Sequence, residues 1–282
     1  MPDGASRKPP LSKDTRLCIS LSGRPSNIGT RFHNHLYDVL GLDYIYKAFT
    51  TTDIAAAIGG VRALGIRGCS VSMPFKEDVL TLVDEIEPSA QAIRSVNTIV
   101  NEVSVPGGRL TASNTDYLAV RQLISDNRLD PDSAVLIRGS GGMAKAVGRA
   151  FVDAGFHTGI VVARNVESGT ALADTLGYQY LPELGSATAA VIVNVTPIGM
   201  AGGPHEHDVA FTETTIAAAD TVFDVVAIPS ETPLIRAARA AGVPVITGAE
   251  VIALQAAEQF VRYTGVLPSR EQIEEASAIS RA

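Results

Sequence analysis

A glycine-rich segment near the middle of the chain has the residue types and spacing that bind a phosphate group. It is formed by six consecutive residues: Gly139, Ser140, Gly141, Gly142, Met143 and Ala144. The first glycine permits a tight turn, the second lets a pyrophosphate approach the backbone, and the alanine lets the flanking helix and strand pack closely. An apolar run precedes the segment and helical spacing follows it, so the amino terminus of a helix would attract the anion. In this context the pattern predicts a dinucleotide site in preference to a structural turn.

The end of the next apolar run carries the residue that should distinguish NADP from NAD. In many dinucleotide sites an acidic residue at this position binds the ribose 2′-hydroxyl. Here the residue is Arg164, and a guanidinium suits the 2′-phosphate of NADP. The alternative is a solvated surface arginine, and Glu167 three residues further on leaves NAD possible. We therefore expect NADP as the cofactor, with NAD as the alternative.

A lysine and an aspartate at two predicted helix starts have side chains that can exchange protons. Pro74 suits the first position of a helix, so we expect Lys76 in the first turn of that helix. The positive end of the helix dipole disfavours an ammonium there and favours the neutral amine, which can act as a base. Asp116 begins a later predicted helix, where simple capping also explains it. Neither residue alone establishes a catalytic role.

The histidines and cysteines predict no metal or redox site. His205 and His207 lie in a loop rich in glycine and proline, and no third metal ligand stands nearby in the sequence. Cys18 and Cys69 both lie in apolar runs, so we expect buried free thiols. No bound metal is therefore predicted.

Strand-like apolar runs alternate with stretches of helical spacing, which predicts parallel sheets joined by crossover helices. The predicted strands cover residues 17–21, 44–49, 68–73, 96–100, 110–113, 134–138, 159–163, 190–195, 221–226 and 243–246. The predicted helices cover residues 30–40, 53–64, 116–125, 142–154, 167–176 and 233–241, with a further helix from Pro74 and one long helix from Glu250.

The composition limits the class of protein. The chain has 282 residues, of which 46% are hydrophobic and 19% are charged, which allows one large domain or two medium ones. A net charge of −7 is a poor match for nucleic acid or an anionic membrane. No apolar run is long enough to span a bilayer, and the polar N-terminus lacks the apolar core of a signal peptide. We expect a cytoplasmic protein, monomeric or homodimeric, that binds a small molecule and neither nucleic acid nor membrane.

Short motifs spread over nearly the whole chain resemble those of the shikimate dehydrogenase family. They occur in the family's order and at close to its spacing, and their conjunction is specific although each motif is short. The matching segments are residues 23–25, 33–34, 71–76, 95–98, 114–116, 139–144, 194–200 and 248–257.

The resemblance implies an α/β fold of two domains with a cleft between them. The first is an N-terminal substrate-binding domain with a mostly parallel sheet, made of residues 1–114 plus 250–282. The second is a C-terminal Rossmann-like NADP-binding domain, made of residues 115–249. The resemblance also assigns roles to individual residues. Lys76 and Asp116 would be the catalytic acid/base pair. The substrate-binding residues would be Ser72, Asn97 and Gln255. Thr196 and Gly248 would lie beside the nicotinamide half of the cofactor.

The segment expected to bind the substrate carboxylate departs from the family pattern. The family has Ser-x-Ser-Pro before the His-Asn pair, whereas this chain has residues 27–30, Asn-Ile-Gly-Thr, and a shorter gap after Pro25. Asn27 stands at a corresponding position and its amide can donate to a carboxylate, while Ser22 and Thr30 lie close in the sequence and could replace part of what is missing. Ala227 replaces a family tyrosine, and Ser168 replaces a second basic residue of the NADP site. We therefore expect a shikimate dehydrogenase-like protein with altered carboxylate recognition.

These observations predict an oxidoreductase that interconverts shikimate, or a related hydroxylated cyclic acid, and its 3-dehydro ketone by hydride transfer. Quinate or another cyclic alcohol is the next candidate substrate, so the resemblance implies aromatic amino acid biosynthesis or quinate/shikimate metabolism. The alternative from a different class is an NADPH-binding sensor or pseudoenzyme of the same fold with little turnover. The altered serine segment favours this alternative, whereas the presence of the catalytic and hydroxyl-binding residues argues against it.

Overall fold

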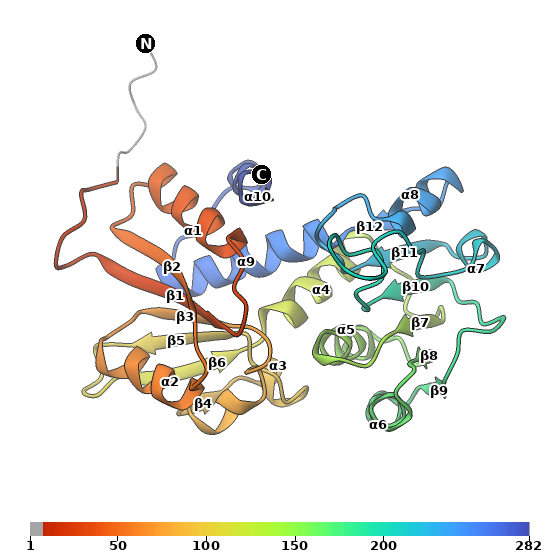
Figure 1. Ribbon diagram of the computed structural model, residues 1–282, viewed down its shortest axis with the longest axis horizontal. Coiled ribbons are helices and arrows are strands. Elements are labelled where there is room, and N and C mark those ends of the chain that lie inside the picture. Colours follow the sequence, from red (N-terminus) through yellow and green to blue (C-terminus); the bar gives the residue numbers. More distant parts are fainter. Residues whose placement is uncertain (1–7, 282) are drawn as a thin grey trace, which may run out of the picture. The chain divides into compact units, whose positions relative to one another are not determined.

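The computed structural model describes residues 8–281, which form two compact α/β units, each with one six-stranded sheet (Figure 1). The first unit consists of the chain up to Thr115 together with the segment from Ala253, and the second unit is Asp116–Ile252. Helices α4 (Thr115–Asp126) and α9 (Gly248–Thr264) contain the two points at which the chain passes from one unit to the other. The predicted two-domain α/β fold is thus confirmed, and the first unit is discontinuous in sequence.

The sheet of the first unit is mixed but mostly parallel. Its strand order is β2-β1-β3-β5-β6-β4. The strands are β1 (Arg16–Ser22), β2 (Tyr44–Thr50), β3 (Gly68–Val71), β4 (Glu85–Ile86), β5 (Thr98–Glu102) and β6 (Arg109–Ser113). The pairs β1–β2, β1–β3 and β4–β6 are parallel, whereas β5 runs antiparallel to both of its neighbours. The carboxyl ends of β1 and β3 therefore meet at one edge of the sheet.

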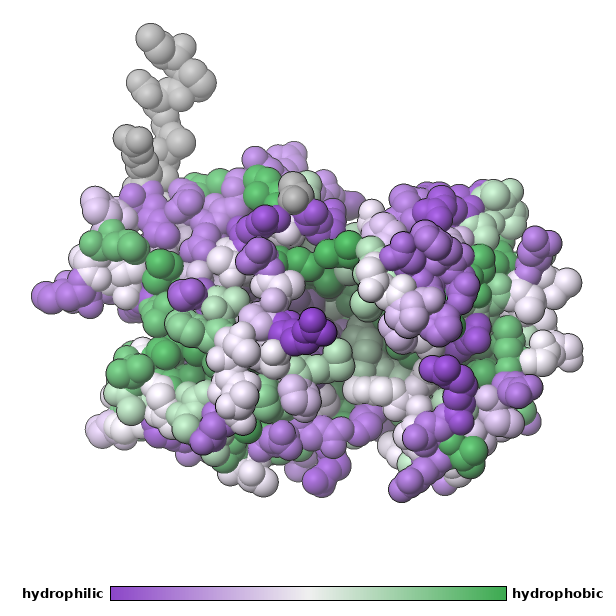
Figure 2. Space-filling view, in the orientation of Figure 1, coloured by the Kyte–Doolittle hydropathy of each residue, from purple (hydrophilic) through white to green (hydrophobic). Residues whose placement is uncertain are grey.

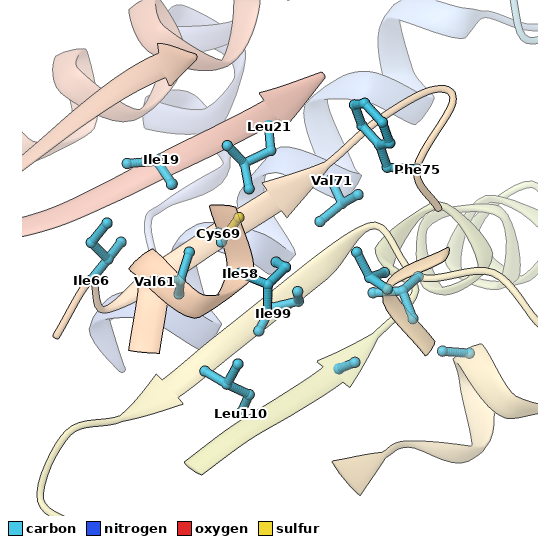
Figure 3. Close-up of a cluster of buried hydrophobic side chains, with 14 residues drawn as sticks. Ile19, Leu21, Ile58, Val61, Ile66, Cys69, Val71, Phe75, Ile99 and Leu110 are labelled. Atoms are coloured by element: carbon cyan, nitrogen blue, oxygen red, sulfur yellow. The ribbon is translucent and has the colours of Figure 1, made fainter. Parts of the chain in front are cut away.

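One face of this sheet packs on α2 (Ile54–Ala63) through a cluster of aliphatic side chains (Figure 3). Leu21 and Val71 come from the two parallel strands β1 and β3, and Ile58 and Val61 come from the helix. Asp53 caps this helix, because its carboxylate accepts a hydrogen bond from the backbone N–H of Ala56 at 2.9 Å. The predicted helix is therefore confirmed, and a side-chain cap starts it.

The opposite side of the first unit is built from elements far apart in the sequence. Figure 1 shows α1 (Ile28–Val39, red) beside α10 (Arg270–Arg281, blue). Phe32 and Leu36 of α1 join Phe260 of α9 and Ala276 of α10 in one buried cluster. His33 lies in the same region, fully buried and stacked on Tyr46 at 4.4 Å between ring centroids, and burial lowers the pKa of His33 to about 3. This histidine is therefore a neutral aromatic core residue.

Two glycines of the first unit give a matched test of this packing. A Cβ added to Gly68 on β3 would lie 2.3 Å from Cδ1 of the buried Tyr263, so we expect Gly68→Ala to lower the free energy of unfolding by roughly 1–3 kcal/mol. Gly59, inside α2, has no atom within 4 Å of such a Cβ. We expect Gly59→Ala to raise that free energy by about 0.5–1 kcal/mol, since alanine favours the helix. Urea unfolding of both variants measures the difference, and equal values would contradict it.

The sheet of the second unit is entirely parallel, with the order β12-β11-β10-β7-β8-β9. Its strands are β7 (Val135–Arg138), β8 (Gly159–Val162), β9 (Gln179–Leu181), β10 (Val191–Asn194), β11 (Thr221–Asp224) and β12 (Val245–Ile246). Numbered within the unit, the order is 3-2-1-4-5-6, that of the Rossmann sheet. The order reverses between β7 and β10, so the loops after these two strands flank the crevice in which such sheets bind ligands.

The helices of the second unit follow the predicted alternation. They are α5 (Gly142–Asp153), α6 (Val166–Leu176), α7 (Glu213–Ala217) and α8 (Pro233–Ala240). Ile216 of α7 and Leu234 of α8 pack against the sheet in one hydrophobic cluster. Side chains cap several of these helices, as in α8, where the hydroxyl of Thr232 accepts a hydrogen bond from the N–H of Ile235 at 3.1 Å.

The prediction that Pro74 begins a helix is wrong. Residues 73–77 form turns, and only the short 3₁₀ helix Asp78–Thr81 follows them. A continuing α-helix would need the carbonyl of Lys76 to accept from Leu80, but that carbonyl accepts from the N–H of Val96 at 2.8 Å. Lys76 is therefore not in the first turn of a helix, and the dipole argument does not apply to it.

The C-terminal region is two helices and not the single long helix predicted from Glu250. Helix α9 ends at Thr264, Gly265 adopts a φ of +75°, and α10 starts only at Arg270 after Pro268. The sequence-based assignment also missed the short elements β4, β9, α3 (Pro88–Gln91) and α7. Each of these is too short for hydrophobic periodicity to reveal.

Figure 2 shows hydrophobic residues on the visible face of the first unit in several groups, with hydrophilic residues beside them. Exposed apolar side chains, such as Leu64, are normal in folded proteins. Within residues 8–281, no helix combines the length and the apolar character needed to cross a membrane.

Candidate functional site

Four of the predicted site residues gather at one edge of the first unit's sheet. Ser22 ends β1, and Ser72 follows β3 with its N–H donating to the carbonyl of Leu21 at 3.0 Å. Asn97 precedes β5, and its carbonyl accepts from the N–H of Val71 at 2.9 Å. The bond from Val96 to the carbonyl of Lys76 then places the lysine segment at the same edge. The fold thus brings these residues together from three separate segments.

The side chain of Asn97 has a fixed orientation. It is 3% exposed, and its Oδ1 accepts from the N–H of Thr115 at 2.7 Å and from the hydroxyl of Thr98 at 2.8 Å. Because a backbone N–H can only donate, the oxygen must face Thr115. The Nδ2 of Asn97 is therefore turned away from Thr115. Asp116 follows Thr115 directly in the first turn of α4, as predicted.

Helix α9 supports this network with two glutamines one turn apart. The Oε1 of Gln255, a predicted substrate residue, accepts from the Thr115 hydroxyl at 3.4 Å. Gln259 was missed at the sequence level, although it is 5% exposed and donates to the Thr98 hydroxyl at 3.0 Å. An uncharged polar residue on the buried face of a predicted helix is the signal that could have identified it. Helix α9 thus fixes the side chains of Thr98 and Thr115 around Asn97.

The altered segment, residues 27–30, forms the N-cap and the first turn of α1 and offers few side-chain donors. Asn27 is at the N-cap position of α1, but its exposed side chain makes no capping hydrogen bond, so its amide can serve a ligand. The hydroxyl of Thr30 is buried without a hydrogen-bond partner within residues 8–281. The hydroxyl of Ser22 accepts from the N–H of Arg24 at 2.9 Å inside the protein. Asn27 is therefore the most available of the predicted carboxylate-binding residues.

The loop after β7 has the shape of a phosphate cradle. Gly139 has a φ of +126°, and a Cβ there would lie 2.8 Å from Cγ2 of Val195, so only glycine fits. Nothing lies within 4 Å of a Cβ at Gly141 or Gly142, which leaves the backbone open to a ligand. Helix α5 begins at Gly142, and Ala144 is fully buried. The loop, the open backbone and the helix terminus fit a pyrophosphate.

Two arginines near this loop fit a second phosphate group. Arg164 is exposed two residues after β8, and Arg138 ends β7. Burial, and then the positive charge of Arg164, lower the pKa of Arg138, so the two guanidiniums lie close enough to repel each other. The hydroxyl of Ser168, which stands in place of a family basic residue, lies 2.7 Å from the hydroxyl of Ser140 in the phosphate loop. This set of donors fits the 2′-phosphate of NADP.

Two further predicted cofactor residues are Thr196, in the loop after β10, and Gly248, the first residue of α9. The hydroxyl of Thr196 donates to Oδ1 of Asn194 at 2.6 Å. A Cβ at Gly248 would lie 2.4 Å from the backbone carbon of Val226, so the start of α9 packs directly on the loop after β11. Asp224, at the end of β11, was missed as a site residue, although an acid that directly ends an apolar strand is visible in the sequence. It is fully buried.

Comparisons with known proteins identify relatives over most of the chain. Residues 27–99 match the family model described as the shikimate dehydrogenase substrate binding domain. A shikimate dehydrogenase-like protein of Haemophilus influenzae is 57% identical, over 96% of this chain and 98% of the relative. A shikimate dehydrogenase (NADP(+)) of Citrifermentans bemidjiense is 34% identical, over 87% of this chain and 88% of the relative. The solved structure of a shikimate 5-dehydrogenase from Thermus thermophilus in complex with NADP(H) and shikimate is 29% identical, with a TM-score of 0.80 and coverage of 94% and 99%.

Proposed function

Because this chain belongs to the shikimate dehydrogenase family, we propose that it is an NADP-dependent oxidoreductase that interconverts shikimate, or a related hydroxylated cyclic acid, and its 3-dehydro ketone. The observation that carries the proposal is the gathering of Ser72, Lys76 and Asn97 at one sheet edge, where the bond from Thr115 to Oδ1 of Asn97 leaves its Nδ2 to donate to a substrate. The phosphate cradle at the reversal point of the second sheet supports the cofactor assignment.

In this proposal the protein orients the substrate and moves a proton. NADP, when bound, accepts the hydride from the substrate carbon at its nicotinamide ring. The Nζ of Lys76 takes the hydroxyl proton during oxidation and returns it during reduction, with Asp116 as its acid/base partner. The Nδ2 of Asn97 and the amide of Gln255 bind the other ring hydroxyls and fix which carbon reacts.

A cofactor-binding protein without turnover is the competing hypothesis, because the serine pair of the family is absent from residues 27–30. Consumption of NADPH with 3-dehydroshikimate, followed by absorbance, separates the two hypotheses. We expect steady consumption that depends on the ketone. Tight NADPH binding without any consumption would support the sensor or pseudoenzyme instead.

Arg164→Ala should weaken NADP binding by about tenfold to a hundredfold, the loss expected when a charge-assisted contact to a phosphate is removed. The affinity for NAD, which lacks the 2′-phosphate, should remain nearly unchanged. Calorimetric titration of both cofactors measures the effect. Arg236→Ala is the matched control, because Arg236 is exposed on α8 and donates to the carbonyl of Glu231. Equal losses for NADP and NAD would contradict the role of Arg164.

A further inference from the structure

Asp224 is a buried acid without a cationic partner. It is 0% exposed, and within residues 8–281 no lysine, arginine or histidine forms an ion pair with it. Its carboxylate instead accepts three hydrogen bonds from uncharged groups: Asn194 Nδ2 at 3.0 Å, Val226 N–H at 3.1 Å and the Thr232 hydroxyl at 2.6 Å. Burial raises the pKa of Asp224 to about 6. A group that is costly to bury and joins three segments needs an explanation beyond ordinary packing.

The three donors lie on the loops at the carboxyl ends of β10 and β11 and at the start of α8. Asn194 ends β10, Val226 follows β11, and Thr232 caps α8. Gly139 and Gly248 pack against these same loops, since a Cβ on either one would collide with residues 195 and 226, respectively. Asp224 is therefore the point at which the loops of the ligand-binding edge are joined to one another.

The carboxylate also contributes to the polarity of Thr196. The Nδ2 of Asn194 donates to Asp224 and to the carbonyl of Ile198 at 3.2 Å, so Oδ1 faces the other way, where it accepts from the N–H of Thr196 at 3.1 Å and from its hydroxyl at 2.6 Å. The hydroxyl of Thr196 thus donates its only proton to Oδ1 of Asn194. The hydroxyl oxygen accepts from the N–H of Ile198 at 3.2 Å and keeps one further lone pair. Toward a ligand, Thr196 can therefore offer a hydrogen-bond acceptor and not a donor.

We propose that Asp224 is a positioning residue that, together with the carbonyl of Ile198, holds Asn194 in the orientation in which Thr196 presents an acceptor to the carboxamide N–H₂ of the nicotinamide ring. The proposal rests on the proposed function, since it assumes that NADP is the ligand of this unit. Asp224 itself touches no cofactor. Its effect should therefore be confined to the nicotinamide half of NADP and should not reach the adenosine half, which other residues bind.

Calorimetric titration with two ligands tests this inference without measuring turnover. Adenosine 2′,5′-bisphosphate carries the adenosine half of NADP and lacks the nicotinamide. We expect Asp224→Ala to weaken NADP binding by about tenfold or more, while the affinity for the bisphosphate changes by less than about twofold. Asp224→Asn should stay close to the wild type, because its amide oxygen can still accept from Asn194 and Val226. Asp153→Asn, which removes an acid bonded to Tyr117 and Arg149, is the control and should change neither affinity.

Asn194→Ala keeps the test decisive if Asp224→Ala does not fold. This substitution removes the amide that connects Asp224 to Thr196 and leaves Asp224 with two donors. We therefore expect the same selective loss of NADP affinity. Equal losses for both ligands, or unchanged NADP affinity in the folded variants, would overturn the positioning role. If the wild-type protein binds neither ligand, the proposed function itself is wrong and the inference falls with it.

Discussion

Lys76→Ala is expected to reduce the turnover of shikimate by about a hundredfold or more, the scale of positioned acid/base catalysis. The substitution removes the amine proposed to take the hydroxyl proton. The backbone of residue 76 should stay in place, because its carbonyl remains bonded to the N–H of Val96. NADP affinity should hold, since the phosphate loop belongs to the other unit. Initial rates at saturating shikimate and NADP measure the effect, and a titration with NADP checks the cofactor.

Lys47→Ala is the matched control for this experiment. Lys47 is an exposed lysine of the same unit, on β2, with its ammonium over the ring of Phe49. Its loss should leave both turnover and NADP affinity unchanged. Turnover by Lys76→Ala at the level of the wild type would remove Lys76 from the mechanism and would favour a different base.

The second large effect concerns the wild-type protein. We expect its kcat/KM for shikimate to be about a hundredfold or more below that of a family enzyme with both serines, because each lost hydrogen bond to a carboxylate costs roughly 1.5–3 kcal/mol. In this chain Gly29 has no side chain, the Thr30 hydroxyl is buried, and the Ser22 hydroxyl already accepts from Arg24. The positive end of α1 and the Asn27 amide replace only part of the loss. Both enzymes should be assayed side by side.

Restoring the serines should reverse part of this deficit. A Cβ at Gly29 would lie 3.4 Å from the Tyr46 hydroxyl, which is ordinary contact, so Gly29→Ser fits without moving the core. We expect the Asn27→Ser/Gly29→Ser variant to lower the KM for shikimate. Asn27→Ser/Gly29→Ala is the control, because it adds the Cβ without the hydroxyl. A wild type as efficient as the enzyme with both serines would contradict the explanation.

Much of the architecture was predictable from the sequence because both units obey local rules. Parallel strands that are buried on both faces appear as continuous apolar runs, and the predicted strands 134–138 and 159–163 correspond to β7 and β8. Helix starts were visible where a capping side chain precedes the helix, as at Asp53. The turn that follows Pro74 could not be predicted from local signals. It depends on the hydrogen bond from the N–H of Val96 to the carbonyl of Lys76, and Val96 is distant in the sequence.

The candidate site was only partly predictable for a related reason. Motif residues such as Lys76, Asn97 and Gly139 could be identified, because each lies in a short sequence motif formed by adjacent residues. Gln259 and Asp224 act through other side chains, on segments that only the fold brings near them. Their positions follow from tertiary packing, which hydrophobic periodicity and glycine spacing do not encode.

The discontinuous first unit has a consequence for the order in which the chain can fold during its synthesis. Phe32, Leu36 and Tyr37 of α1 reach their buried positions only against Phe260 and Tyr263 of α9. The ribosome synthesises those aromatic residues of α9 after the entire second unit. The apolar side chains of α1 are therefore made well before the residues that bury them. The second unit contains all six strands of its own sheet and can fold first, although it is made later. Until α9 arrives, the nascent N-terminal segment is the part of the chain that a chaperone would bind.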